Sequence, residues 1–373
     1  MESRTGIVLT GGGARGAYQA GVLRGLAALS AEKSKENPFK VITGVSAGAI
    51  NGAYLAAHCD DIMNATQFLW DMWSTVHTEK IFRSDPISLG RITFRWIMEL
   101  STGGFFQKKK SRALLDTTPL YDYIRKEIAF NDIQKRVKEG HLHALAVSAL
   151  NYSTGFSRTF FQGDASIQPW ERTRRKGERM KIKPEHILAS AAIPLLFPPV
   201  KVGGHYFGDG SLRNYTPLSP AIKMGANKLI VISVRQREVG QLEEEMAKPT
   251  LGRIIGVVLN SVLMDAIDLD HERLTRINKT LRAVDGQRTD VLNPIDVITI
   301  RPSVDIAEIA KEEMSKMPLT IRHLIKGLGN EGEASDLISY LLFEPAFTQR
   351  LLELGYKDVM DKKEELYPFL CDQ

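Results

Sequence analysis

The chain has little cysteine and no long apolar run. Its 373 residues include two cysteines, Cys59 and Cys371, which excludes a disulfide framework and favours a reducing compartment. No apolar run approaches the roughly 20 residues that are needed to span a bilayer. The first residues lack a basic segment followed by an apolar stretch, so we expect no signal peptide. These absences favour a cytoplasmic protein, with at most peripheral membrane contact.

Positive charge is only slightly in excess, at a formal net charge of +5. It gathers in two clusters, at residues 108–112 and 172–183. No nucleic-acid motif accompanies either cluster, so we expect no nucleic-acid partner, and each reads most simply as a solvated face. Aromatic residues precede the first cluster, which makes Phe94–Arg112 a candidate membrane contact or lid. The alternative for Phe94–Arg112 is a core helix followed by an exposed loop.

Two glycine-rich turns near the N-terminus carry the chemistry. Each follows an apolar run and precedes a helical pattern, which predicts a strand, a tight turn and a helix. Gly44–Gly48 has the pattern G-x-S-x-G, a nucleophile elbow that exposes Ser46 on a strained turn. Gly11–Gly16 offers backbone N–H groups at a helix start, which suits an oxyanion. Together the two turns predict acyl transfer.

The first turn also fits a nucleotide-binding pattern, G-x-G-x-x-G. That fingerprint needs an acidic residue about 20 positions later at the end of a strand, whereas Glu36 falls in a polar loop. A Walker loop is excluded because Ala17 and Tyr18 occupy the Lys and Ser/Thr positions. The nucleotide interpretation is therefore weak.

A serine nucleophile needs a base, and none of the eight histidines lies in a loop suited to that role. His271 lies on a predicted solvated helix face, and His323 lies beside the apolar face of a predicted C-terminal helix. His205 lies in a predicted hairpin. Asp209 stands between two glycines at the end of a predicted strand. A turn aspartate is the alternative. Because no histidine is suitably placed, a two-residue catalytic unit of Ser46 and Asp209 is favoured.

The order of elements predicts the fold class. Short β-rich runs alternate with helical patterns, which is typical of an α/β protein with a mostly parallel sheet. Residues from about 60 to 139 indicate a helical insertion. From residue 305 onward the chain is helical, with Ile321, Leu324, Ile325 and Leu328 on one face. We predict a catalytic domain over 5–304 and a helical C-terminal extension over 305–373 packed on its core.

Four segments taken in order resemble the patatin-like phospholipases, over about Thr5–Val234. These segments are Gly11–Gly16, Gly44–Gly48, the Ala-Ser-Ala-Ala-Ile-Pro stretch ending at Pro194, and Asp209-Gly210. One departure is Ser211, where the family usually has Gly or Ala.

The resemblance implies a three-layer α/β/α fold and a Ser–Asp dyad. Ser46 would be the nucleophile and Asp209 the general base, with no metal or organic cofactor. Backbone N–H groups of Gly11, Gly12 and Gly13, with Arg15 alongside, would form the oxyanion hole.

The expected function is serine-dependent lipid acyl hydrolysis of the phospholipase A or lysophospholipase type. The substrate would be a phospholipid or another acyl-ester lipid, cleaved through an acyl-enzyme. Two alternatives stay open: an acyltransferase with an acceptor other than water, and a non-catalytic lipid-binding regulatory module. Nothing in the sequence indicates the headgroup, the acyl position, the chain length or the oligomeric state.

Overall fold

The computed structural model describes residues 4–34, 36–85, 113–236, 250–263, 266–283, 293–327 and 334–371. The candidate lid or membrane contact Phe94–Arg112, with its lysine cluster, lies outside these residues. So does Leu328, one of the four residues predicted on one face of a C-terminal helix. Among the described helices, none combines the length and the apolar composition required to cross a bilayer.

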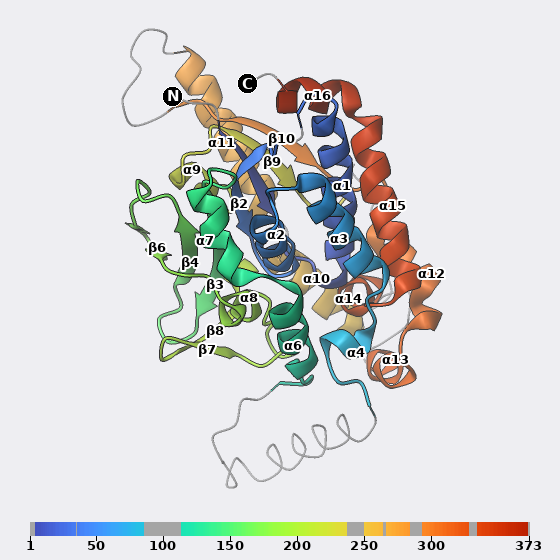
Figure 1. Ribbon diagram of the computed structural model, residues 1–373. Helices are drawn as coiled ribbons and strands as arrows, with labels where there is room; N and C mark the ends of the chain where they lie inside the picture. Colours follow the sequence, from blue (N-terminus) through green and yellow to red (C-terminus); the bar gives the residue numbers. More distant parts are fainter. Residues whose placement is uncertain are drawn as a thin grey trace.

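A ten-stranded sheet forms the centre of the molecule, in the order β10-β9-β1-β2-β3-β4-β6-β5, with β8 also pairing with β3 and β7 with β8 (Figure 1). The strands from β10 to β3 run parallel, whereas β3 pairs antiparallel with β4 and β8. The predicted mostly parallel sheet is thus confirmed. The strands are β1 Thr5–Leu9, β2 Phe39–Gly44, β3 Ala144–Asn151, β4 Ser157–Gly163, β5 Trp170–Arg172, β6 Arg175–Arg179, β7 Val200–Val202, β8 His205–Asp209, β9 Lys228–Ile232 and β10 Asp296–Ile300.

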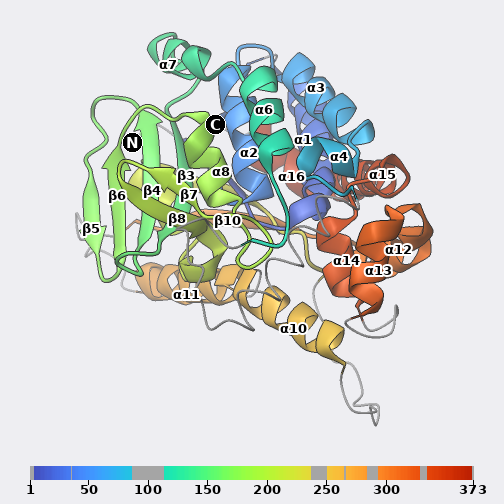
Figure 2. The same ribbon diagram turned by 90° about the horizontal axis from the view of Figure 1, so that it is seen from below.

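Helices cover both faces of this sheet. Figure 2 shows α11 on one side and α1, α2 and α3 on the other. The longer helices are α1 Gly16–Ala31, α2 Ala47–Ala57, α3 Ile62–Ser74, α6 Thr118–Glu127, α7 Phe130–Lys138, α10 Leu251–Leu263, α11 Ala266–Ala283, α12 Ile306–Glu313, α13 Leu319–Lys326, α15 Pro345–Asp361 and α16 Lys363–Cys371. The shorter ones are α4 Thr78–Ile81, α8 Pro184–Ser190, α9 Ser219–Lys223, α14 Ser335–Leu341 and the 3-10 turns η1 Gly13–Arg15, η2 Gly210–Arg213 and η3 Met314–Lys316.

Side chains of β1 alternate between two apolar cores. Ile7 and Leu9 belong to the larger core, beneath the face that α1 and α2 cover. Val8, between them, belongs to a smaller core that includes Ile267 of α11. Successive strand residues point to opposite faces, so a strand buried on both sides is apolar throughout. This is the three-layer α/β/α arrangement that the sequence predicted.

The C-terminal helices pack directly on the first helix. A Cβ on Gly21 of α1 would lie 2.1 Å from the carbonyl oxygen of Leu352 in α15. A Cβ on Gly355 of α15 would lie 2.3 Å from the carbonyl oxygen of Tyr18. The two helices therefore approach more closely than any side chain at these positions allows. The boundary at residue 305 stays a prediction, although helices beyond it share the larger core.

The second basic cluster lies on the edge of the sheet. Residues 172–183 include β6, and with β5 they form an antiparallel hairpin that the sequence did not predict. Gly177 of β6 lies against the ring of Trp170 in β5, and this contact packs the two strands of the hairpin together. The contact cannot be predicted from the composition of the segment. The Nη1 atom of Arg179 donates to the carbonyl of Gly163 at 2.9 Å, so part of this charge orders the neighbouring strand.

We predict that Gly21→Ala destabilises the protein by about 2 kcal/mol, because the added methyl group overlaps the backbone of α15. Chemical denaturation monitored by circular dichroism measures this difference. Gly327→Ala is the matched control: the φ of Gly327 is −67°, which is helical, and the nearest neighbouring atom among the described residues would lie 3.4 Å from the added Cβ. The control is expected to change stability by less than about 0.5 kcal/mol. Equal stability of the two variants would contradict the close helix contact.

Candidate active site

Ser46 lies at the junction of β2 and α2 with a backbone that few residues adopt. Its φ of 56° and ψ of −125° place it outside the common regions, which is a strained conformation for a residue with a Cβ. The turn is pinned because the N–H of Val45 donates to the carbonyl of Leu9 at 3.1 Å. The structure therefore has the elbow geometry that the sequence predicted.

The two glycines of the elbow are required by backbone contacts. A Cβ on Gly44 would lie 2.2 Å from the carbonyl oxygen of Gly48. A Cβ on Gly48 would lie 2.3 Å from the carbonyl oxygen of Leu9, at the end of β1. Both distances are far below van der Waals contact, so the pattern G-x-S-x-G follows from the packing of α2 on β1.

Asp209 ends β8 and is fully buried beside this elbow. Its carboxylate accepts a hydrogen bond from the N–H of Ser211 at 2.8 Å. Its other oxygen, Oδ2, has no hydrogen-bond partner within the described residues. Burial raises the pKa of Asp209 to about 6, and contacts with Ser211 and with the Ser46 side chain oppose this rise. The structure thus places Ser46 and Asp209 next to each other, and the pKa of the Asp209 carboxyl is closer to neutral pH than the ordinary value of an aspartate.

Gly11 completes a three-way contact with the two serines. A Cβ on Gly11 would lie 2.6 Å from Oγ of Ser211 and 3.2 Å from Cβ of Ser46. Neither the N–H of Gly11 nor that of Gly12 donates to another described residue. Gly13 adopts a φ of +56°, and a Cβ there would lie 2.3 Å from the carbonyl oxygen of Tyr340. The glycine turn therefore lies between the elbow and the C-terminal helix α14.

The Arg15 side chain does not face Ser46. Its Nε donates to Oγ of Ser339 at 2.7 Å, and its Nη2 forms an ion pair with Asp336 at 3.0 Å. Its guanidinium also lies over the ring of Tyr340, 4.7 Å from the centroid. The resemblance to the patatin-like phospholipases implied that Arg15 lies alongside the oxyanion hole. In the structure its guanidinium is bound to α14, more than 300 residues away in the chain.

Ser190 is a site residue that sequence reasoning missed. Its Oγ accepts from the N–H of Ser46 at 3.0 Å and donates to the carbonyl of Ser148 at 2.6 Å. Two residues further on, the carbonyl of Ala192 accepts from the N–H of Asp209 at 2.9 Å. The sequence signal for Ser190 is the Ala-Ser-Ala-Ala-Ile-Pro stretch, which contributes to the family resemblance but does not indicate what Ser190 binds.

An apolar pocket opens beside Ser46, with about 510 Å³ of empty space including its mouth. Its walls come from distant parts of the chain: Ala47 and Ile50 of α2, Trp73 of α3, Phe197 and Phe343. The Nε1 of Trp73 donates to Oδ1 of Asn51 at 2.8 Å, which leaves the rest of the indole for apolar contact. The lining is of the apolar kind that contacts hydrocarbon groups.

All eight histidines lie in the described part of the chain, and none lines this pocket or contacts Asp209. His271 approaches Oγ1 of Thr299 at 3.2 Å, while His323 and His205 are exposed. The geometry is thus a serine elbow on an α/β/α sheet, with a buried aspartate in place of a histidine.

A family model described as patatin-like phospholipase matches residues 7–222, which is more than half of the chain. The chain therefore belongs to the patatin-like phospholipase family, as the motifs indicated. Membership of this family indicates a lipid acyl hydrolase. No curated protein matches the sequence.

Two solved structures are similar to the chain. The first is VipD from Legionella pneumophila, at 13% identity and a TM-score of 0.35, over 98% of this chain and 67% of that one. The second is human GIVD cytosolic phospholipase A2 in complex with methyl gamma-linolenyl fluorophosphonate, at 11% identity and a TM-score of 0.34. The match covers 99% of this chain, which spans 60% of the length of the human protein.

We predict that Asp209→Asn stabilises the protein at neutral pH. Folding raises the pKa of Asp209 from about 3.9 to about 6, so between these values the folded state binds a proton that the unfolded state has lost. Stability therefore falls as the pH rises through this range, by up to about 3 kcal/mol in total. Asparagine does not ionise, so the Asp209→Asn variant should not lose this stability as the pH rises. The gain should be largest near pH 8 and shrink as the pH approaches 4.

Urea unfolding at intervals from pH 5 to pH 8 measures the effect. Asp122→Asn, at an exposed position on α6, is the control and should show no such gain. A variant Asp209→Asn that is no more stable than the wild type at pH 8 would refute the role of burial.

Proposed function

We propose that this protein hydrolyses fatty acyl esters of lipids with Ser46 as nucleophile and Asp209 as general base. The observation that carries the proposal is the buried Asp209 carboxylate beside a serine on a strained elbow, with one oxygen that has no hydrogen-bond partner among the described residues. A serine hydroxyl is a weak nucleophile unless an adjacent base takes its proton. With a pKa near 6, Asp209 is ionised at neutral pH and is a better base than an exposed aspartate.

The reaction would proceed in two steps. In the first, Asp209 takes the Ser46 proton while Oγ attacks the ester carbonyl carbon, and the tetrahedral intermediate expels the alcohol, which takes up the proton. In the second, Asp209 takes a proton from water as the water attacks the acyl-enzyme. The fatty acid then leaves and Ser46 regains its proton.

The negative charge of the tetrahedral intermediate needs donors close to Ser46. The N–H groups of Gly11 and Gly12 have no partner among the described residues, and a Cβ on Gly11 would lie 3.2 Å from Cβ of Ser46. We assign these groups, with that of Gly13, to the oxyanion hole, where one donor is worth roughly 3–4 kcal/mol of barrier. Arg15 acts in this proposal by holding the turn on α14.

The apolar pocket favours a long acyl chain as the substrate group. Its lining is almost entirely apolar, and Ser46 stands at its edge. A phospholipid or lysophospholipid would place its ester at Ser46 and its hydrocarbon chain in the pocket. Hydrolysis is proposed over transfer to another acceptor because membership of the patatin-like phospholipase family indicates a lipid acyl hydrolase. Product analysis with added alcohol acceptors distinguishes the two.

We predict that Ser46→Ala and Asp209→Asn each lower the release of fatty acid from mixed phospholipid vesicles by at least about a thousandfold. A fluorophosphonate probe should label the wild type at Ser46. Ser153→Ala and Asp122→Asn change exposed residues away from the elbow and are the controls. For the wild type, kcat/KM should fall below about pH 6, where Asp209 becomes protonated.

If the folded Asp209→Asn variant retained activity, the proposed Ser46–Asp209 dyad would be wrong. Failure of the folded wild type to react with the probe would instead favour a lipid-binding module.

We also predict that Ile50→Phe shortens the acyl chain that the protein accepts, because the larger ring fills the pocket beside Ser46. Activity on short-chain esters should stay within about threefold of the wild type, whereas activity on long-chain esters should fall about tenfold or more. A series of p-nitrophenyl esters of increasing chain length measures the profile. An unchanged profile would mean that the acyl chain lies elsewhere.

A further inference from the structure

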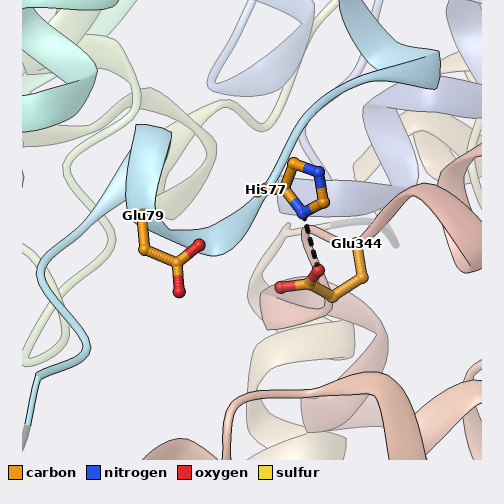
Figure 3. A group of neighbouring side chains, drawn as sticks. All are labelled: His77, Glu79 and Glu344. Carbon is orange, nitrogen blue, oxygen red and sulfur yellow. Dashed lines mark hydrogen bonds and ion pairs between the residues drawn. The ribbon is translucent and has the colours of Figure 1, made fainter.

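Three side chains on the far side of the apolar pocket wall form a group that the proposed reaction does not use. His77, Glu79 and Glu344 each offer one ligand atom, and these atoms lie within 4.8 Å of one another (Figure 3). His77 directly precedes α4 and Glu79 lies in its first turn, whereas Glu344 directly precedes α15. Two segments far apart in the sequence thus meet through three potential metal ligands.

The distances between the potential ligand atoms suit a small divalent cation. Nδ1 of His77 lies 3.1 Å from Oε2 of Glu344. A tetrahedral zinc ion with ligands at about 2.0–2.1 Å places neighbouring ligand atoms about 3.3 Å apart. Among the described residues, the carboxylate of Glu79 accepts one long hydrogen bond, from Oγ of Ser84 at 3.5 Å. It therefore needs only a side-chain rotation to become the third ligand.

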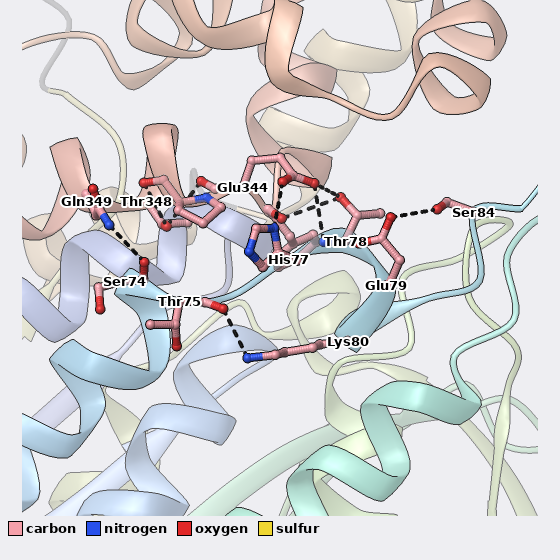
Figure 4. A network of polar contacts seen from close by, with 12 residues as sticks. Ser74, Thr75, His77, Thr78, Glu79, Lys80, Ser84, Glu344, Thr348 and Gln349 are labelled. Atoms are coloured by element: carbon pink, nitrogen blue, oxygen red, sulfur yellow. Dashed lines mark hydrogen bonds and ion pairs between the residues drawn. The ribbon is translucent and has the colours of Figure 1, made fainter.

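Glu344 is already oriented for such a role. Its Oε1 accepts hydrogen bonds from Oγ1 of Thr78 at 2.7 Å and from the N–H of Thr78 at 3.3 Å. These bonds direct Oε2 toward His77, as Figure 4 shows. Hydrogen bonds of this kind fix metal-binding carboxylates in other proteins.

The same carboxylate lacks a permanent positive partner. The Glu344 side chain is 11% exposed, and among the described residues its one ion-pair partner is His77. The nearby Lys80 donates to the carbonyl of Thr75 and lies over the ring of Tyr123. In Figure 4 its ammonium points away from Glu344. A mostly buried carboxylate is usually paired with a cation or a metal.

We propose that His77, Glu79 and Glu344 bind one Zn²⁺ ion, with water completing the coordination. An imidazole nitrogen with two carboxylates suits zinc and similar transition metals, whereas Ca²⁺ and Mg²⁺ prefer oxygen ligands alone. The half-exposed imidazole leaves the site open to solvent, so the ion has a path of entry.

The ion would act on structure and not on the ester. Val76 and Phe343 directly precede His77 and Glu344, and Ile81 lies two residues after Glu79. All three line the apolar pocket beside Ser46. Zinc would join the segment around α4 to the start of α15 and so hold two walls of the pocket together. This inference does not depend on the Ser46–Asp209 chemistry.

Zinc binding to the full-length, chelator-treated protein tests the proposal. We expect isothermal titration to give one Zn²⁺ per chain, and zinc to raise the melting temperature while Mg²⁺ does not. Glu79→Gln should weaken binding at least tenfold and abolish most of the zinc-dependent rise. His77→Ala should do the same. Glu353→Gln and His323→Ala, both at exposed positions outside the group, are the matched controls and should bind as the wild type does.

Glu79→Gln is the decisive variant, because it removes an exposed carboxylate with one long contact and should leave the melting temperature without zinc unchanged. The proposal is overturned if the wild type shows no saturable binding of one zinc ion. It is also overturned if both Glu79→Gln and His77→Ala bind zinc with wild-type affinity.

Discussion

The site depends on the close approach of two backbones, where the start of α2 lies against the end of β1. Gly48 allows this approach, since a Cβ there would lie 2.3 Å from the carbonyl of Leu9. That same carbonyl accepts the N–H of Val45, which fixes the chain just before the serine. Ser46 therefore keeps a φ of 56° because its neighbours on both sides are fixed, and not because the residue itself favours that conformation.

One short segment ties the two halves of the candidate dyad together. The side chain of Ser190 accepts from the N–H of Ser46, and the carbonyl of Ala192 accepts from the N–H of Asp209. The elbow belongs to β2 and the aspartate to β8, which do not pair with each other but both pair with β3. The end of α8 and the two residues after it thus set the relative position of Ser46 and Asp209, which the sheet alone brings only to the same edge.

Local signals made the fold and the elbow predictable, because strand, glycine turn and helix follow one another within a few residues. Contacts between distant segments were not predictable in this way. The resemblance implied that Arg15 belongs with the oxyanion hole, yet its partners Asp336 and Ser339 lie in the C-terminal helices. Likewise, Trp73 and Phe343 meet at the apolar pocket only after folding, and neither carries a motif.

The position of Arg15 also bears on the strength of the proposed base. Burial is the largest cause of the raised pKa of Asp209, and only two serines oppose it. A cation in direct contact would stabilise the carboxylate and lower that pKa, which would weaken the base. Arg15 is a fully buried cation on the turn next to the elbow, and its ion pair with Asp336 offsets its charge there. The C-terminal helices therefore bind the glycine turn through Arg15, and this arginine is not among the groups that shift the pKa of Asp209.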